Sequence, residues 1–185
     1  MLLLFSSIQS DWNRYLRLHK KYRIFLFLFI FFHNPGMFFS LIYRIEYYLF
    51  HYRLLPVRYI GYICYPFYFL LTYYILDIHI SPRVAIGKGL YIHNRGIIIA
   101  DSMKAGENLT LIGPLTVGYK GFGEGEKAAT IGRNVVIYSG AKVIGDVRIG
   151  NNVHIGANAV VIKDVPPHST AVGIPARIIE RRHEK

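Results

Sequence analysis

The chain has 185 residues, enough for one domain with an appendage and for a buried core that needs no disulfides. Hydrophobic residues make up 52% of it and charged residues 18%, which excludes a disordered chain. Lysine and arginine number 22 against 11 acidic residues, so the net charge is +11. The single cysteine, Cys64, excludes a disulfide framework and a cysteine-built zinc site, and we expect it to be a packed thiol.

These averages combine two unlike parts that meet near Asp77. Residues 1–76 hold 24 of the 28 aromatic residues but only two of the 17 glycines. They carry eight basic and two acidic residues, a net charge of +6, whereas the remainder carries 14 and nine, a net charge of +5. We therefore divide the chain into an arm (1–76), a glycine-rich domain (77–180) and a basic tail (181–185).

The arm is predicted to be helical. Ser10 and Asp11 are expected to cap its first helix, and the apolar run Ile24–Phe32 has nine residues, too few to cross a bilayer as a helix. The motif His-Asn-Pro-Gly at residues 33–36 is expected to end that helix, since proline breaks a helix and glycine permits a turn.

The stretch Val57–Leu76 is apolar and aromatic, and it could span a membrane by length alone. Its tyrosines and Pro66 favour a helix that lies at the interface instead. Basic residues beside apolar aromatics attract anionic lipid headgroups, so the arm is predicted to face a membrane. The alternative is an aromatic cap buried against a neighbouring subunit. Nucleic-acid binding is not expected, because the basic residues accompany no recognisable reading motif.

From Ile131 onward, an aliphatic residue recurs at every sixth position, and a small or β-branched residue follows each of them four positions later. The first set is Ile131, Ile137, Val143, Ile149, Ile155 and Val161, and the second is Val135, Ala141, Val147, Val153, Ala159 and Val165. The same pattern is interpreted to run through Ile80, Ile86, Ile92 and Ile98, with a slip of one residue before Leu111 and Val117. This period fits neither a helix nor simple alternation, but it fits short strands wound as a three-sided coil, with each aliphatic residue inward and the next outward.

Residues 118–130 interrupt the period. They are rich in glycine and mixed in charge, and the spacing from Val117 to Ile131 is not a multiple of six, so we expect a loop expelled from the coil. Expelled loops on rigid scaffolds often carry function. The open ends of such a coil also lead us to expect caps or oligomers.

These repeats, with IGANAVVIKDVPPHSTAVGIPARII at 155–179, resemble the left-handed β-helix acyltransferases with hexapeptide repeats. Within that group, the chain is most similar to the serine acetyltransferase-like branch that O-acetylates bacterial exopolysaccharide, capsule or O-antigen. The motifs that carry this likeness are SDWNRY at 10–15, HNPG at 33–36 and GLYIHNRGIII at 89–99. The resemblance implies a mainly β fold, a left-handed parallel β-helix preceded by the helical arm. It also implies a homotrimer that binds acetyl-CoA between neighbouring subunits.

The activity that the resemblance implies is direct transfer of an acetyl group from acetyl-CoA to a hydroxyl of a surface polysaccharide or its sugar precursor. A histidine takes the hydroxyl proton, and backbone N–H groups stabilise the oxyanion. Lipid-linked glycan precursors suit a cytoplasmic protein held peripherally at the inner face of the membrane. Serine O-acetylation and a non-catalytic β-helix scaffold stay open as alternatives, as does a small acyl group other than acetyl.

His93 is the candidate base, because it follows the inward Ile92 and should face outward, and it matches the histidine that opens the family's catalytic segment. Asp77, in a similar Asp-Ile-His triplet, is implied to orient that histidine. Serine acetyltransferases place an aspartate where this chain has Ile92, and a second histidine where it has residues 126–129. These departures favour a sugar hydroxyl over serine.

For acetyl-CoA, the resemblance carries over Ser139, Ala157, Ile162, Lys163 and Arg177. Ser139 and Ala157 are 18 residues apart and should stack on adjacent coils, where a pantetheine arm needs small residues. Lys163 and Arg177 are cations that could reach the nucleotide phosphates, with plain surface charge as the alternative. The histidine spacing does not reproduce the metal site of β-helical carbonic anhydrases, so no metal is expected.

Overall fold

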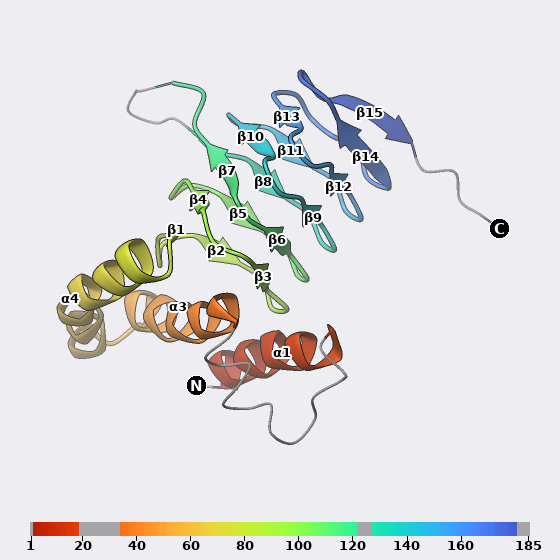
Figure 1. Ribbon diagram of the computed structural model, residues 1–185. Coiled ribbons are helices and arrows are strands. Elements are labelled where there is room, and N and C mark those ends of the chain that lie inside the picture. Colours follow the sequence, from red (N-terminus) through yellow and green to blue (C-terminus); the bar gives the residue numbers. More distant parts are fainter. Residues whose placement is uncertain (1, 19–33, 122–126, 181–185) are drawn as a thin grey trace.

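The computed structural model describes residues 2–18, 34–121 and 127–180. The apolar run Ile24–Phe32, residues 122–126 of the expected loop and the basic tail lie outside the described residues. Within the described ranges, helices come first and short strands follow (Figure 1).

The described part of the arm is helical. Helix α1 spans Leu2–Leu18, α3 spans Pro35–His51, and α4 spans Leu55–Leu70 and continues into the π-helical turn η1, Leu71–Ile75. The expected cap at Ser10 and Asp11 is wrong, because α1 runs through both residues. Asn34 caps α3 instead: its side-chain oxygen accepts from the Met37 N–H at 3.4 Å, and Pro35 occupies a first-turn position that needs no N–H donor.

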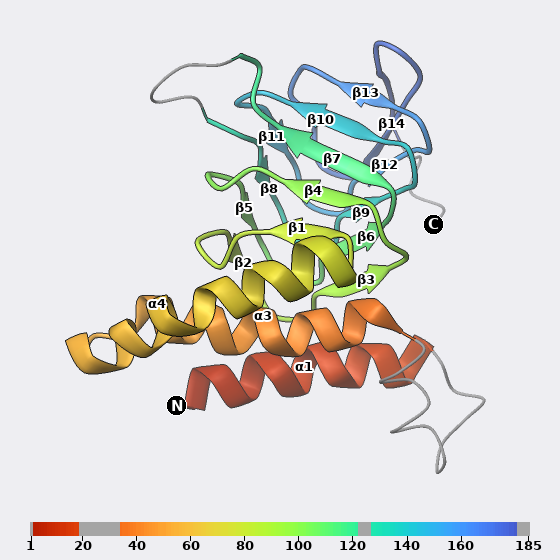
Figure 2. The same ribbon diagram turned by 60° about the vertical axis from the view of Figure 1, so that its left-hand side comes forward.

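The coil is built from strands of two to four residues in three sheets. Sheet A contains β1 (Ile78–Ile80), β4 (Ile97–Ile99), β7 (Leu115–Gly118), β10 (Lys142–Ile144) and β13 (Val160–Val161). Sheet B contains β2 (Ala85–Ile86), β5 (Lys104–Ala105), β8 (Thr130–Ile131) and β11 (Arg148–Ile149). Sheet C contains β3 (Tyr91–His93), β6 (Thr110–Ile112), β9 (Val136–Ile137), β12 (His154–Ile155), β14 (Ser169–Val172) and β15 (Arg177–Glu180). Paired strands are parallel except β14 and β15, so the predicted parallel β-helix is confirmed (Figures 1 and 2).

The six-residue pattern places the core correctly from Ile131 onward. Each of the twelve aliphatic, small or β-branched positions predicted there is buried, with no more than 6% of its surface exposed. Glycine follows several inward residues where successive turns stack closely; a Cβ at Gly132 would lie 2.8 Å from the backbone carbon of Gly150.

The inward assignment of Ile98 is wrong. Ile98 is 48% exposed, whereas Ile97 and Ile99 on either side of it are buried at 0% and 4%. The turn after β3 contains two residues with positive φ, Asn94 at 70° and Gly96 at 76°, and it is one residue longer than the six-residue period allows. The inward set therefore continues at Ile99, and Ile98 faces out.

The helices cover the open end of the coil beside β1, β2 and β3 (Figure 2). Buried tyrosine hydroxyls bond to backbone groups of the first turn that have no strand partner on this side. Tyr43 donates to the Val84 carbonyl at 2.6 Å, Tyr68 donates to that of Ile80 at 2.6 Å, and Tyr15 accepts from the Ile92 N–H at 2.8 Å. The inner face of the arm is therefore an aromatic cap on the coil of its own chain.

The outer face of α4 and η1 is apolar and exposed. It includes Leu54, Leu55, Tyr59, Ile60, Tyr62, Ile63, Phe67, Leu70, Tyr74 and Ile75. The expectation of a packed thiol is wrong, because α4 turns Gly61 and Tyr68 inward and leaves Cys64 exposed. Within the described residues, no helix is long and apolar enough to cross a membrane.

Candidate functional site

The predicted site residues lie at two edges of the three-sided coil. We call the turns that lead from sheet C to sheet A, with the strand ends beside them, the C–A corner. The turns that lead from sheet A to sheet B form the A–B corner. Because the strands stack in register, residues from different turns of the coil come together along each corner.

His93 ends β3 at the C–A corner and is exposed, as the outward assignment requires. Its neighbour Ile92 is held by the Tyr15 hydroxyl, which accepts from the Ile92 N–H at 2.8 Å and donates to its carbonyl at 3.2 Å. The plane of the His93 ring is nearly parallel to that of the Tyr91 ring, and their centroids are 6.2 Å apart. Burial raises the pKa of both Tyr15 and Tyr91, so their hydroxyls stay protonated near neutral pH. Helix α1 thus fixes the strand that presents the imidazole.

Asp77 lies beside the turn that follows His93. Its backbone carbonyl accepts from the Gly96 N–H at 2.8 Å. Its exposed carboxylate lies 3.5 Å from His79 Nε2, a contact that is an ion pair only when His79 is protonated, and the His79 ring stacks on Tyr73 with centroids 3.9 Å apart. Asp77 thus lies at the same C–A corner as His93, but its carboxylate contacts His79.

Ser139 and Ala157 stack at the C–A corner as their spacing predicts. The N–H of Asn158, next to Ala157, donates to the Ser139 carbonyl at 3.0 Å. Ser139 is half-buried and Ala157 is exposed, so the edge carries small side chains with accessible backbone. Arg177 is exposed at the start of β15, just after the last turn of this corner.

Ile162 and Lys163 lie elsewhere, in the turn that follows β13 at the A–B corner. Both are exposed, Ile162 by 52%. The expelled segment leaves the coil at the same corner, after β7. One chain therefore divides the predicted acetyl-CoA residues between two corners, on opposite sides of sheet A.

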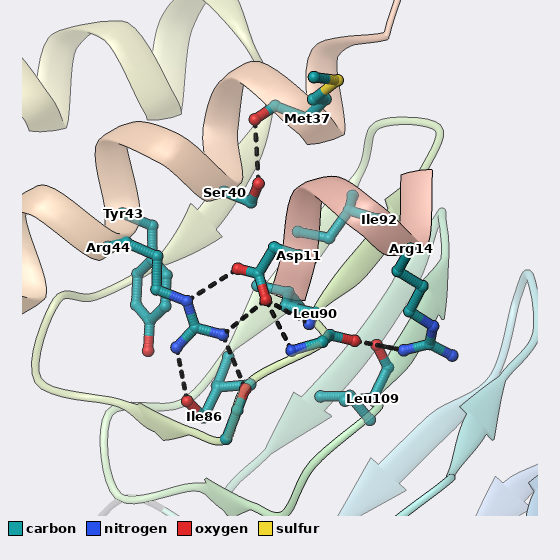
Figure 3. A network of polar contacts seen from close by, with 12 residues as sticks. Asp11, Arg14, Met37, Ser40, Tyr43, Arg44, Ile86, Leu90, Ile92 and Leu109 are labelled. Atoms are coloured by element: carbon teal, nitrogen blue, oxygen red, sulfur yellow. Dashed lines mark hydrogen bonds and ion pairs between the residues drawn. The ribbon is translucent and has the colours of Figure 1, made fainter. Parts of the chain in front are cut away.

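A polar network that the sequence reasoning missed locks the arm to the first turn of the coil (Figure 3). Arg44 Nε lies 2.8 Å from Asp11 Oδ2, and both side chains are buried. Asp11 Oδ1 also accepts from the N–H groups of Gly89 at 2.7 Å and Leu90 at 2.8 Å. Arg44 donates in turn to the Ile86 carbonyl at 2.6 Å. The signal that could have found this pair is Arg44, a charge among the mostly apolar residues of α3, which needs a partner when buried. In the described ranges, no group of three histidine, cysteine or acidic residues could hold a metal ion.

Fold and repeats together define a left-handed parallel β-helix of the hexapeptide type. Residues 128–163 match the family described as bacterial transferase hexapeptide (six repeats). Serine acetyltransferase of Staphylococcus aureus is 44% identical over 105 residues, covering 56% of this chain and 49% of that protein. The chain thus spans about half the length of the curated relatives it matches.

Solved structures extend the likeness of fold to the whole chain. The crystal structure of Neisseria gonorrhoeae serine acetyltransferase gives a TM-score of 0.81 at 24% identity, covering 100% of this chain and 68% of that one. Soybean serine acetyltransferase complexed with serine gives 0.78 at 26% identity, covering 97% and 70%. These relatives are named for serine and not for polysaccharide, so their names favour the serine alternative over the polysaccharide interpretation.

Proposed function

We propose that the protein transfers an acetyl group from acetyl-CoA to the hydroxyl of L-serine. The observation that carries the proposal is the 44% identity over 105 residues to a serine acetyltransferase. The exposed imidazole of His93, on a strand that α1 fixes, supplies a group suited to the chemistry. The chain would act in the cytoplasm, where acetyl-CoA is available.

The proposed reaction needs one base and one leaving group. His93 takes the hydroxyl proton as the oxygen bonds to the thioester carbonyl carbon, since a neutral imidazole is an effective base near neutral pH. The carbon–sulfur bond then breaks, and the proton passes to the departing thiolate. Asp77 would hold the imidazole only after its carboxylate leaves His79.

A sugar hydroxyl is the second candidate acceptor, and the two places where this chain departs from the serine acetyltransferase pattern favour it. Ile92, immediately before His93, is fully buried, and Ala128 and Ala129 at the end of the expelled segment are also buried. None of these side chains can pair with the charged ammonium or carboxylate of serine. A sugar would need no such partner.

An acceptor screen decides between the two. The full-length protein is incubated with acetyl-CoA and either L-serine or a panel of neutral hexoses and N-acetylhexosamines, and free thiol is measured. Release of thiol with L-serine above the hydrolysis background supports the main proposal. Release with sugars alone replaces serine by the second candidate, and release with neither acceptor contradicts both.

The division of the acetyl-CoA residues between two corners supports a homotrimer with shared sites. A C–A corner of one copy beside an A–B corner of the next would bring Ser139 and Ala157 near Lys163 of the neighbour. Light scattering on the purified protein should then give three times the chain mass. Lys163→Gln should raise KM for acetyl-CoA with kcat little changed, because a phosphate contact contributes binding in ground and transition state alike. A monomer with full activity would contradict the shared site.

The outer face of α4 supports peripheral binding to an anionic membrane. Ile63, Phe67 and Tyr74 are 77%, 69% and 74% exposed, and no acidic residue occurs from Tyr47 to Leu76. Such a surface should cosediment with phosphatidylglycerol vesicles, and Ile63→Asp with Phe67→Asp should abolish this. Ile98→Asp, an exposed isoleucine of the coil, is the matched control. Failure of the wild-type protein to sediment would refute this surface.

A further inference from the structure

A concave basin of about 480 Å³ lies between α1 and the first turns of the coil. Every residue that lines it is polar or cationic, and none is a carboxylate. Its cations are Arg14 and Arg17 from α1 and Lys88 from the coil. The volume is in the range of small-molecule sites, but the lining is far more polar than such sites usually are. A ligand that matches this lining is polar and anionic.

Arg14 carries the strongest part of the argument. Its guanidinium donates to the carbonyls of Gly89 and, at 3.0 Å, Leu109 (Figure 3). It also donates to the Thr110 hydroxyl at 2.6 Å. All three acceptors are neutral. Among the ion pairs of the residues that the structure describes, none joins Arg14 to a carboxylate; Asp11, one helical turn before it, pairs with Arg44 and acts on Arg14 from a longer distance. Burial is the main cause that lowers the pKa of Arg14, and the negative charge of Asp11 offsets part of that effect.

The other two cations add to this excess. Arg17 lies one helical turn beyond Arg14, so the two like charges face the same side of α1 and repel each other. Lys88 has one carboxylate nearby, Glu107 Oε1 at 3.6 Å, and that contact is exposed. Three cations thus face one acidic group at the rim, and an anion would relieve the imbalance.

The rest of the lining is suited to hydroxyl groups. Asn108 and Asn134 take the left-handed conformation, with φ of 60° and 56°, and Asn108 Nδ2 donates to Asn134 Oδ1 at 3.0 Å. Ser10 and Asn13 face them from α1. Side-chain amides and hydroxyls both donate and accept, as the hydroxyls of a sugar do.

We propose that this basin binds a sugar phosphate, with the phosphate between Arg14, Arg17 and Lys88 and the sugar hydroxyls on the asparagine amides. The binding requires no acetyl transfer, so it can fail while the proposed function holds, and the reverse. Lys88, Asn108 and Asn134 lie in the turns that precede β3, β6 and β9, whereas His93 ends β3, so the basin is separate from the candidate base.

Calorimetry on the full-length protein at low ionic strength tests the proposal, with glucose 1-phosphate, glucose and inorganic phosphate as separate probes. Glucose 1-phosphate should bind more tightly than either fragment. Because Arg14 also docks α1, the variant of choice is Arg17→Gln with Lys88→Gln, which should weaken binding about tenfold or more through loss of charge-assisted hydrogen bonds. Arg83→Gln, an exposed arginine outside the basin, should bind as the wild type does.

Three results would overturn the proposal. The first is no binding of glucose 1-phosphate, and the second is unchanged affinity in the double variant. The third is an affinity for inorganic phosphate equal to that for glucose 1-phosphate, which would show a general anion site without sugar recognition.

Discussion

The buried carboxylate of Asp11 and the guanidinium of Arg44 meet at 2.8 Å, and between them they join α1, α3 and the first turn of the coil. The hydrogen bonds that they make to the coil go to backbone groups. The pair therefore satisfies N–H and C=O groups at the open end of the coil. The end of a β-helix is thereby closed by charged side chains together with aromatic ones.

Asp11→Ala should destabilise the protein by about 3–5 kcal/mol, because it leaves the Arg44 charge buried without a partner. Asp11→Asn should cost less, since an amide oxygen can still accept from Gly89 or Leu90. Urea unfolding followed by circular dichroism measures both. A cost below about 1 kcal/mol for Asp11→Ala would mean that the pair does not hold the arm to the coil.

Glu46 should make stability depend on pH. It is buried in α3, Oε1 has no hydrogen-bond partner in the described part of the chain, and burial raises its pKa to about 7. Between the usual value of 4.5 and about 7, the folded protein keeps a proton that the unfolded chain has released, so the free energy of unfolding falls as pH rises through that window.

The loss should amount to at most about 3 kcal/mol, and Glu46→Gln should remove it. Unfolding free energies measured at several pH values across the window provide the check. Glu107→Gln, at an exposed carboxylate, is the control and should leave the slope as it is. A wild-type slope that persists in Glu46→Gln would assign the dependence to another group.

The register of β4 predicts opposite outcomes for two adjacent isoleucines. Ile99→Ala removes a buried side chain and should cost about 2–5 kcal/mol, whereas Ile98→Ala on the outer face should stay within about 0.5 kcal/mol. Thermal unfolding of the two variants side by side measures the difference. Equal costs would put Ile98 back in the core.

The coil was predictable because its core repeats a local rule. From Ile131 onward, each inward position follows from a spacing of six residues, and tertiary contacts do not alter which positions are buried. The inward assignment of Ile98 failed because the turn at Asn94 and Gly96 contains one extra residue. The spacing of aliphatic residues does not reveal that an asparagine will adopt a positive φ. The arm was harder to predict from the sequence. Ser10 and Asp11 are residue types that often cap a helix, but Asp11 instead pairs with Arg44, 33 positions away in sequence.

The positions of the candidate site residues in the fold were predictable in part for the same reason, while their roles stay predictions. His93 and the pair Ser139 and Ala157 follow from the period, which fixes outward positions and stacking. The contact of Asp77 with His79 depends on how the chain enters β1, where no repeat precedes it. In the proposed trimer, Lys163 would meet the C–A corner of a neighbouring copy, which a single sequence does not place.

The central claim is that His93 is the base of an acetyl transfer, and the direct measurement is kcat for acetyl-CoA turnover in His93→Ala, with the acceptor that the screen identifies. His79→Ala, at the histidine that contacts Asp77, is the matched comparison. A fall of about 10²–10⁴-fold in kcat for His93→Ala, with a native unfolding transition, is the result that the account predicts. Turnover undiminished in His93→Ala would contradict it.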